Sequence, residues 1–295
     1  MHTPVVIWKA AAALAAPVLA ATATVFGLAG SAGPAYGALR PDAGALRVAA
    51  LGDSGSSGEG AGGYFRGTAG PHGCHRSPHA WPFQLARQTP HHKVRKLDRS
   101  YLVACSGAAS LSSQLRAFKK LRPKPAVVTI TMGWDAVGLD GLLENCFSRN
   151  CVGDGKLAAA KRKAGSKLTN LAPSFLQVQG ADRGAAVLLV GYPHFIATSA
   201  RCTGLRGFSR AERRGLTSLI GLLDSDLNAI AAKTGLRYVA VTGALSGHEL
   251  CTGRHSWVST AGFGKMDSQQ AGHPKTAGQT AIARSVGRYI NSHHL

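Results

Sequence analysis

Short apolar runs alternate with longer amphipathic segments along the chain from about residue 45 onward. Each run is short, aliphatic and β-branched, and apolar at nearly every position, which is typical of parallel strands buried on both faces. The predicted strands are Leu46–Leu51, Tyr101–Ala104, Ala126–Met132, Ala185–Val190 and Arg237–Val241.

The segments between these runs have the periodicity of amphipathic helices. The predicted helices are Ala80–Gln88, Ser110–Leu121, Lys156–Leu171, Arg210–Thr234 and Thr276–Ile290. Ser209 is a good N-cap and Gly235 a good C-cap for the longest of them. Alternation of strands and helices predicts one α/β domain with an open, mostly parallel sheet covered on both faces and a site at the carboxyl ends of its strands.

The first 37 residues have a different pattern, with Lys9 as the only Lys, Arg, Asp or Glu. An apolar stretch from Ala10 to about Gly30 follows, and Ala35 and Gly37 are small residues at the −3 and −1 positions of a cleavage site. We interpret residues 1–37 as a secretory signal peptide and 38–295 as the exported domain. The alternative is a membrane anchor, because a stretch of about 20 apolar residues can span a bilayer.

The number and the positions of the cysteines agree with export of the protein. All six cysteines follow the predicted signal peptide, and an even count in an exported protein predicts three disulfides. The sequence leaves the pairing open, and the simplest pairing is sequential: Cys74–Cys105, Cys146–Cys151 and Cys202–Cys251. Zinc ligation is disfavoured because only Cys146 and Cys151 are close together in the chain, so we expect no metal.

The chain carries a formal net charge of +20, to which the predicted signal peptide contributes only Lys9. Such a field attracts polyanions, including nucleic acid, anionic lipid and acidic cell wall. Only 6% of residues are aromatic and no basic cluster is interleaved with them, which argues against dedicated nucleic-acid binding. We expect attraction to anionic lipid or wall, with simple solvation of the surface as the alternative, and we expect a monomer.

The first predicted strand ends abruptly in the glycine- and serine-rich stretch 52–60. A buried strand that delivers Ser54 onto a glycine-flanked turn exposes its hydroxyl as a nucleophile. A serine nucleophile also needs a base and donors for an oxyanion. Gly107, the 133–135 turn and His273 follow later elements and can supply these groups at the same edge of the sheet.

Four sequence blocks carry a specific resemblance over residues 45–290. They are residues 52–60, 104–108, 129–135 and 273–278. In order and spacing they resemble the SGNH (GDSL-type) hydrolases, above all the secreted actinobacterial esterases and lipases. The resemblance implies a three-layer α/β/α, flavodoxin-like fold and hydrolysis of carboxylic esters without any cofactor.

The resemblance also assigns roles to individual residues. Ser54 is the nucleophile and its backbone N–H the first oxyanion donor. Gly107 gives a second backbone N–H, and His273 is the general base.

Two positions depart from the family pattern. Asp135 stands where the family has an Asn whose amide is the third oxyanion donor, and an ionised carboxylate has no proton to donate. A protonated Asp could donate, if burial or a neighbouring negative charge raises its pKa. Gln270 stands where many members have an acid that orients the histidine. Asp267, Gln270 or a backbone carbonyl could take that place.

These features predict a secreted serine esterase or lipase that forms an acyl-enzyme on Ser54, with fatty-acyl or lipid esters as substrates. Acetylated glycans are the second substrate class. A different kind of function also stays open: a catalytically weakened protein of this fold that binds an anionic cell wall or membrane.

Overall fold

The computed structural model describes residues 45–89, 93–199, 201–203, 205, 207–264, 269–293 and 295. The predicted signal peptide, residues 1–37, lies outside these ranges. Within them, no helix combines the length and hydropathy needed to cross a bilayer.

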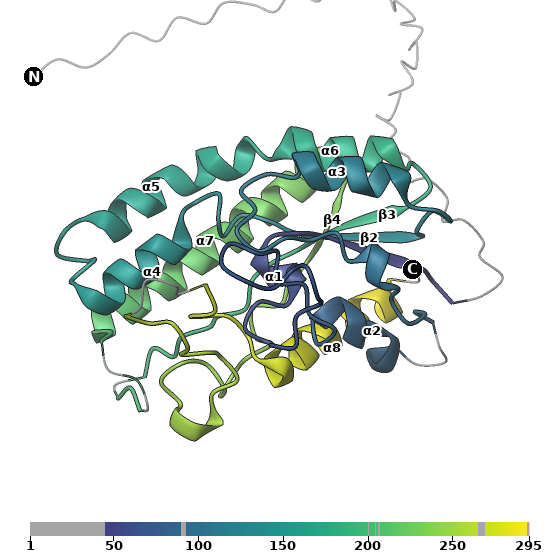
Figure 1. Cartoon of the computed structure of the whole chain (residues 1–295). Helices are drawn as coiled ribbons and strands as arrows, with labels where there is room; N and C mark the ends of the chain where they lie inside the picture. The colour runs from purple at the N-terminus through teal and green to yellow at the C-terminus, as the bar shows by residue number, and fades with distance from the viewer. Residues whose placement is uncertain are drawn as a thin grey trace, which may run out of the picture. The chain divides into compact units, whose positions relative to one another are not determined.

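Four parallel strands form the sheet, in the order β1-β2-β3-β4 (Figure 1). They are β1 (Val48–Gly52), β2 (Val127–Thr131), β3 (Ala186–Val190) and β4 (Arg237–Val239). The residues of β1 and β2 are all buried, as the continuous apolar runs predicted. The carboxyl ends of β1 and β2 are in register, with Gly52 opposite Thr131, so the segments that follow them begin side by side.

Helices cover both faces of the sheet (Figure 1). One layer contains α2 (Trp81–Gln88) and α8 (Thr276–Ser292), which pack against each other. The opposite layer contains α3 (Ser112–Lys120), α5 (Lys156–Thr169), α6 (Ala172–Ala181) and α7 (Arg210–Thr234). The three-layer α/β/α prediction is therefore confirmed.

The predicted strand Tyr101–Ala104 is wrong. A 3₁₀ turn, Arg99–Tyr101, occupies its start, and Leu102 forms a single parallel bridge to Ala50. The N–H groups of Val103 and Ala104 both donate to the Ala50 carbonyl, at 2.8 and 3.0 Å. The Arg76 guanidinium takes the Val103 and Ala104 carbonyls that a regular ladder would use. The segment is buried beside β1, as its pattern required, but without strand geometry.

Helices α4 (Leu139–Ser148) and α6 were not predicted from the sequence. Helix α4 follows the left-handed Gly138, and α6 begins directly after α5 with Pro173 at its second position. A proline in the first turn of a helix loses no hydrogen bond, because the N–H groups there have no partner within the helix. Pro173 is therefore compatible with the start of a new helix. The predicted segment Lys156–Leu171 is thus followed by a separate helix.

Helix α7 begins and ends at the predicted caps. The Ser209 side chain accepts from the Glu212 N–H, and the Glu212 carboxylate accepts from the Ser209 N–H, which forms a capping box. Gly235, with φ of 71°, ends the helix.

The sequential disulfide pairing is also confirmed: Cys74–Cys105, Cys146–Cys151 and Cys202–Cys251. Glu212 lies near the second bridge and accepts from the Cys151 N–H. Both sulfurs there are consumed by the disulfide, so this cluster has no thiolate to offer a metal ion.

Candidate active site

Ser54 lies where β1 passes directly into the short helix α1 (Ser54–Ser57). The strand ends at Gly52, whose φ is 125° and where a Cβ would lie 1.9 Å from the Thr131 carbonyl oxygen. Only glycine fits this approach between β1 and β2. The tight strand-to-helix turn predicted for the nucleophile is therefore present, and it depends on the close contact between the two strands.

Asp53, immediately before the nucleophile, links the ends of three strands. One carboxylate oxygen accepts from Gly55 N–H at 3.0 Å and caps α1. The other accepts from the N–H groups of Gly133 and Trp134, at 3.0 and 3.1 Å, and from the Tyr192 hydroxyl at 2.5 Å. Burial raises the pKa of Asp53 to about 6, although these hydrogen bonds oppose the shift. At neutral pH it is a fully buried carboxylate that fixes the catalytic turn.

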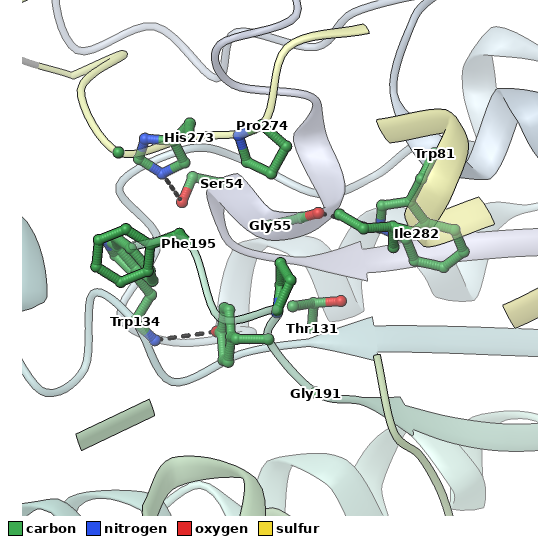
Figure 2. A pocket seen from close by; sticks show the side chains of 13 residues that line it. Ser54, Gly55, Trp81, Thr131, Trp134, Gly191, Phe195, His273, Pro274 and Ile282 are labelled. Atoms are coloured by element: carbon green, nitrogen blue, oxygen red, sulfur yellow. Dashed lines mark hydrogen bonds between the residues drawn. The ribbon is translucent and has the colours of Figure 1, made fainter. Parts of the chain in front are cut away.

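His273 contacts the nucleophile directly. Its Nε2 lies 2.7 Å from Ser54 Oγ, and both side chains are buried (Figure 2). Its Nδ1 lies 3.1 Å from the Ala271 carbonyl oxygen, which can only accept, so Nδ1 carries the proton and Nε2 is free to accept from the serine. The structure thus brings together a serine and a base in the right tautomer.

Among the described residues, the Ala271 backbone carbonyl is the group that contacts Nδ1 of His273. Gln270 contributes a backbone carbonyl that accepts from the His273 N–H at 3.3 Å, and its side chain makes no hydrogen bond to the ring. Asp267 lies outside the described residues. Of the three orienting groups considered from the sequence, the described residues supply the backbone carbonyl.

Two backbone N–H groups near Ser54 have no acceptor among the described residues: those of Ser54 itself and of Gly107. Gly107 is exposed, with φ of 77°. The preceding Cys105 N–H donates to the Gly52 carbonyl at 3.0 Å, which brings this turn to the carboxyl end of β1. Free N–H groups at that edge are suited to hold an oxyanion.

Asp135 carries a neutral carboxyl group. One of its side-chain oxygens is buried and has no hydrogen-bond partner within the described ranges. Burial, together with the negative charges of Asp53, Asp140 and Glu59, raises the pKa of Asp135 to about 8. At neutral pH Asp135 is therefore mainly protonated and able to donate a hydrogen bond, as the Asn of the family does.

A pocket of about 420 Å³, including its open mouth, adjoins Ser54 and His273 (Figure 2). Large apolar side chains dominate its wall: Trp81, Trp134, Phe195 and Ile282. The Trp134 ring lies 5.2 Å from the His273 ring and 5.3 Å from Phe195. Such a wall next to a nucleophile suits the hydrocarbon part of a substrate.

Several known proteins are similar to this chain in sequence and in fold. The family model described as GDSL-like Lipase/Acylhydrolase matches residues 50–281. Lipase 1 of Streptomyces coelicolor is 30% identical over 238 residues, which cover 78% of this chain and 81% of that protein.

Two solved structures agree with the sequence match. Phospholipase A1 from Streptomyces albidoflavus NA297 has a TM-score of 0.66 and 29% identity, and the extracellular lipase of Streptomyces rimosus has a TM-score of 0.66 and 25% identity. Each match covers 84% of this chain and 99% of the other. The chain therefore belongs to the GDSL-like lipase/acylhydrolase (SGNH) family, in the branch of the actinobacterial lipases, and is a carboxylic ester hydrolase.

Proposed function

We propose that this protein is a secreted esterase or lipase that cleaves fatty-acyl esters through an acyl-enzyme on Ser54. The observation that carries the proposal is the 2.7 Å contact between Ser54 Oγ and His273 Nε2, with Nδ1 already occupied by its own proton. A serine hydroxyl paired with a neutral imidazole is the minimal apparatus for acyl transfer.

The geometry supports a two-step reaction. Ser54 Oγ attacks the ester carbonyl carbon while its proton passes to His273 Nε2, and the carbonyl oxygen becomes an oxyanion. When that intermediate collapses, the alcohol leaves with the proton from His273 and the acyl group stays on Ser54. Water then attacks the acyl-enzyme by the same route and releases the carboxylic acid.

Three donors stabilise the oxyanion in this mechanism: the N–H groups of Ser54 and Gly107 and the carboxyl O–H of Asp135. The buried, unpartnered oxygen of Asp135 and its pKa of about 8 support the third assignment. A protonated carboxyl replaces the family's amide as a donor, and it does so only while it keeps its proton.

The substrate assignment follows from the pocket. Its apolar wall offers burial to several methylene groups, each worth about 0.8 kcal/mol, and offers few polar partners to a sugar. The similar proteins named above are called lipases and a phospholipase A1, which supports an acyl chain as the recognised part.

A series of p-nitrophenyl esters from acetate to palmitate tests this function. We expect kcat/KM to rise from acetate toward longer chains, because each buried methylene adds binding energy. Faster turnover of acetate than of all longer esters would favour an acetylated-glycan esterase. Absence of turnover along the whole series would contradict the proposed function.

Secretion belongs to the same proposal. It is supported by the signal-like residues 1–37, by the three disulfides and by the description of the Streptomyces rimosus relative as extracellular. Intact mass of the protein from a culture medium of an exporting host should show an N-terminus at Ala38. An uncleaved chain retained in the membrane fraction would instead indicate an anchor.

A further inference from the structure

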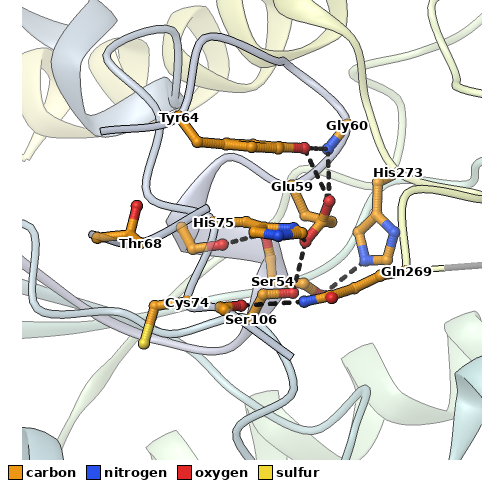
Figure 3. A network of polar contacts seen from close by, with 12 residues as sticks. Ser54, Glu59, Gly60, Tyr64, Thr68, Cys74, His75, Ser106, Gln269 and His273 are labelled. Atoms are coloured by element: carbon orange, nitrogen blue, oxygen red, sulfur yellow. Dashed lines mark hydrogen bonds and ion pairs between the residues drawn. The ribbon is translucent and has the colours of Figure 1, made fainter. Parts of the chain in front are cut away.

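Glu59 is a fully buried acid close to Ser54, and its one part in the reaction so far is the negative charge that helps to raise the pKa of Asp135. Four donors surround its carboxylate (Figure 3). Gly60 N–H and the Tyr64 hydroxyl donate to one oxygen, at 3.3 and 2.8 Å. His75 and the Ser106 hydroxyl contact the other, at 2.7 and 2.8 Å.

His75 links Glu59 to the loop at Gly70. Its Nδ1 lies 2.7 Å from a Glu59 carboxylate oxygen, and its Nε2 lies 2.8 Å from the Gly70 carbonyl oxygen. The Tyr64 ring stacks on the imidazole at 4.3 Å, and the pair of Glu59 and His75 is buried.

A buried pair of ionisable groups is a poor way to gain stability, because the cost of removing the two groups from water offsets their attraction. The contribution of the Glu59–His75 pair is instead to hold the groups that contact it in fixed positions. One of those groups is Ser106, the residue immediately before the oxyanion donor Gly107. Besides the contact with Glu59, the Ser106 turn is held by the Cys74–Cys105 disulfide and by two backbone hydrogen bonds, from Ser106 N–H to the Cys74 carbonyl and from Cys105 N–H to the Gly52 carbonyl, each of 3.0 Å.

The residue after Glu59 also packs against His273. A Cβ at Gly60 would lie 2.9 Å from both the Cβ and the carbonyl oxygen of His273, so the Gly60 backbone lies close to His273. The buried pair is therefore placed between the turn that carries the oxyanion donor and the loop that carries the base.

We propose that Glu59, paired with His75, is a positioning residue that aims the Gly107 N–H at the oxyanion through the Ser106 hydroxyl. This inference rests on the proposed function, because it assigns Glu59 to the oxyanion hole of the Ser54 reaction. The hydroxyl of Ser106 is the one side-chain link between the pair and the turn that the described residues show.

Ser106→Ala is the sharpest test, since it cuts that link and leaves the Glu59–His75 pair in place. We expect kcat to fall about 10-fold to 100-fold with KM changed less than about twofold, because a misplaced donor weakens the transition state and not substrate binding. The affinity of a trifluoromethyl ketone, which forms the oxyanion on Ser54, should fall by the same factor as kcat/KM. Ser110→Ala is the matched control: Ser110 is exposed on the same segment and should leave both values unchanged.

Glu59→Gln provides a second variant, which keeps the volume of the side chain and removes its charge. We expect the same selective loss of kcat, together with a lower Tm, because a Gln side chain has only one oxygen to accept the hydrogen bonds that the two carboxylate oxygens accept. An unchanged kcat in Ser106→Ala, or a rise in KM alone, would overturn the positioning role.

A fluorophosphonate probe on the wild type separates the two proposals. Labelling of Ser54 together with a fully active Ser106→Ala variant would refute only the positioning role. A wild type that is folded but neither labelled nor active would refute the proposed function itself.

Discussion

Replacing Ser54 with alanine is expected to lower kcat/KM for p-nitrophenyl esters by about 10⁵-fold or more, to the level left by binding and the oxyanion donors alone. The Ser54 hydroxyl is the group proposed to form the acyl bond, and its hydrogen bond goes to His273. Its removal leaves the Asp53 contacts that fix the turn intact. We therefore expect the Tm to stay within a few degrees of the wild type.

Ser56→Ala is the matched control for this experiment. Ser56 lies on the same short helix, and its hydroxyl is buried without a hydrogen-bond partner in the described ranges. A fluorophosphonate probe should label the wild type and Ser56→Ala, and should leave Ser54→Ala unlabelled. Substantial turnover by Ser54→Ala, or labelling at another serine, would refute the assigned nucleophile.

The second large effect is expected at Asp135. At pH 7, Asp135→Ala should lower kcat by about 10²–10³-fold, as loss of one oxyanion donor does. Asp135→Asn should stay close to the wild type there, because the amide donates as the protonated acid does. As the pH rises through about 8, the wild type should lose activity when Asp135 ionises beside Asp53, Asp140 and Glu59, whereas Asp135→Asn should not.

Two outcomes would contradict this role of Asp135. If Asp135→Asn is much faster than the wild type already at pH 6, the acid is ionised there and impairs the site. If Asp135→Ala is as active as the wild type, Asp135 gives nothing to the oxyanion. In either case the proposed hydrolase would work with two backbone donors.

The dependence of protein stability on pH gives an independent test of the protonation of Asp135. The folded state raises the pKa of Asp135 from 3.8 to about 8, so it binds a proton that the unfolded chain has released. The stabilising contribution of that proton is fully present below pH 3.8 and disappears as the pH rises through about 8. The Tm of the wild type should therefore fall relative to that of Asp135→Asn between these limits.

The sequence predicts elements whose apolar pattern is continuous and whose ends are marked by local signals. Strand β1 and helix α7 are of this kind, and α7 begins and ends at Ser209 and Gly235 as expected. The segment Tyr101–Ala104 has the same apolar pattern as a strand, yet Arg76, distant in the sequence, takes the carbonyls that a strand would pair. The sequence therefore predicts that Tyr101–Ala104 is buried, but not which donors its backbone carbonyls accept from.

The residues of the candidate site also fall into two groups: those that local sequence signals predict and those that they do not. The placement of Ser54 and His273 could be predicted because Ser54 follows β1 and His273 precedes α8 at the same edge of the sheet. Gly107 also lies at that edge, although the strand predicted before it does not form. The roles of Asp53 and Glu59 depend on partners far away in the chain, such as Tyr192 and Ser106. The sequence contains one local signal for Asp53, which is its position as the N-cap of the helix that starts at Ser54. The proton on Asp135 depends on burial and on three neighbouring acids, which the sequence does not bring together.

The Cys74–Cys105 bridge joins the residue before His75 to the residue before Ser106. Before the two thiols are oxidised, only hydrogen bonds keep these neighbours of the Glu59–His75 pair and of the oxyanion turn together. Disulfides form outside the reducing cytosol. Under the proposed export, this covalent constraint on the turn is added only after the chain has left the cytosol, and the newly made chain carries Ser54, Gly107 and His273 without it.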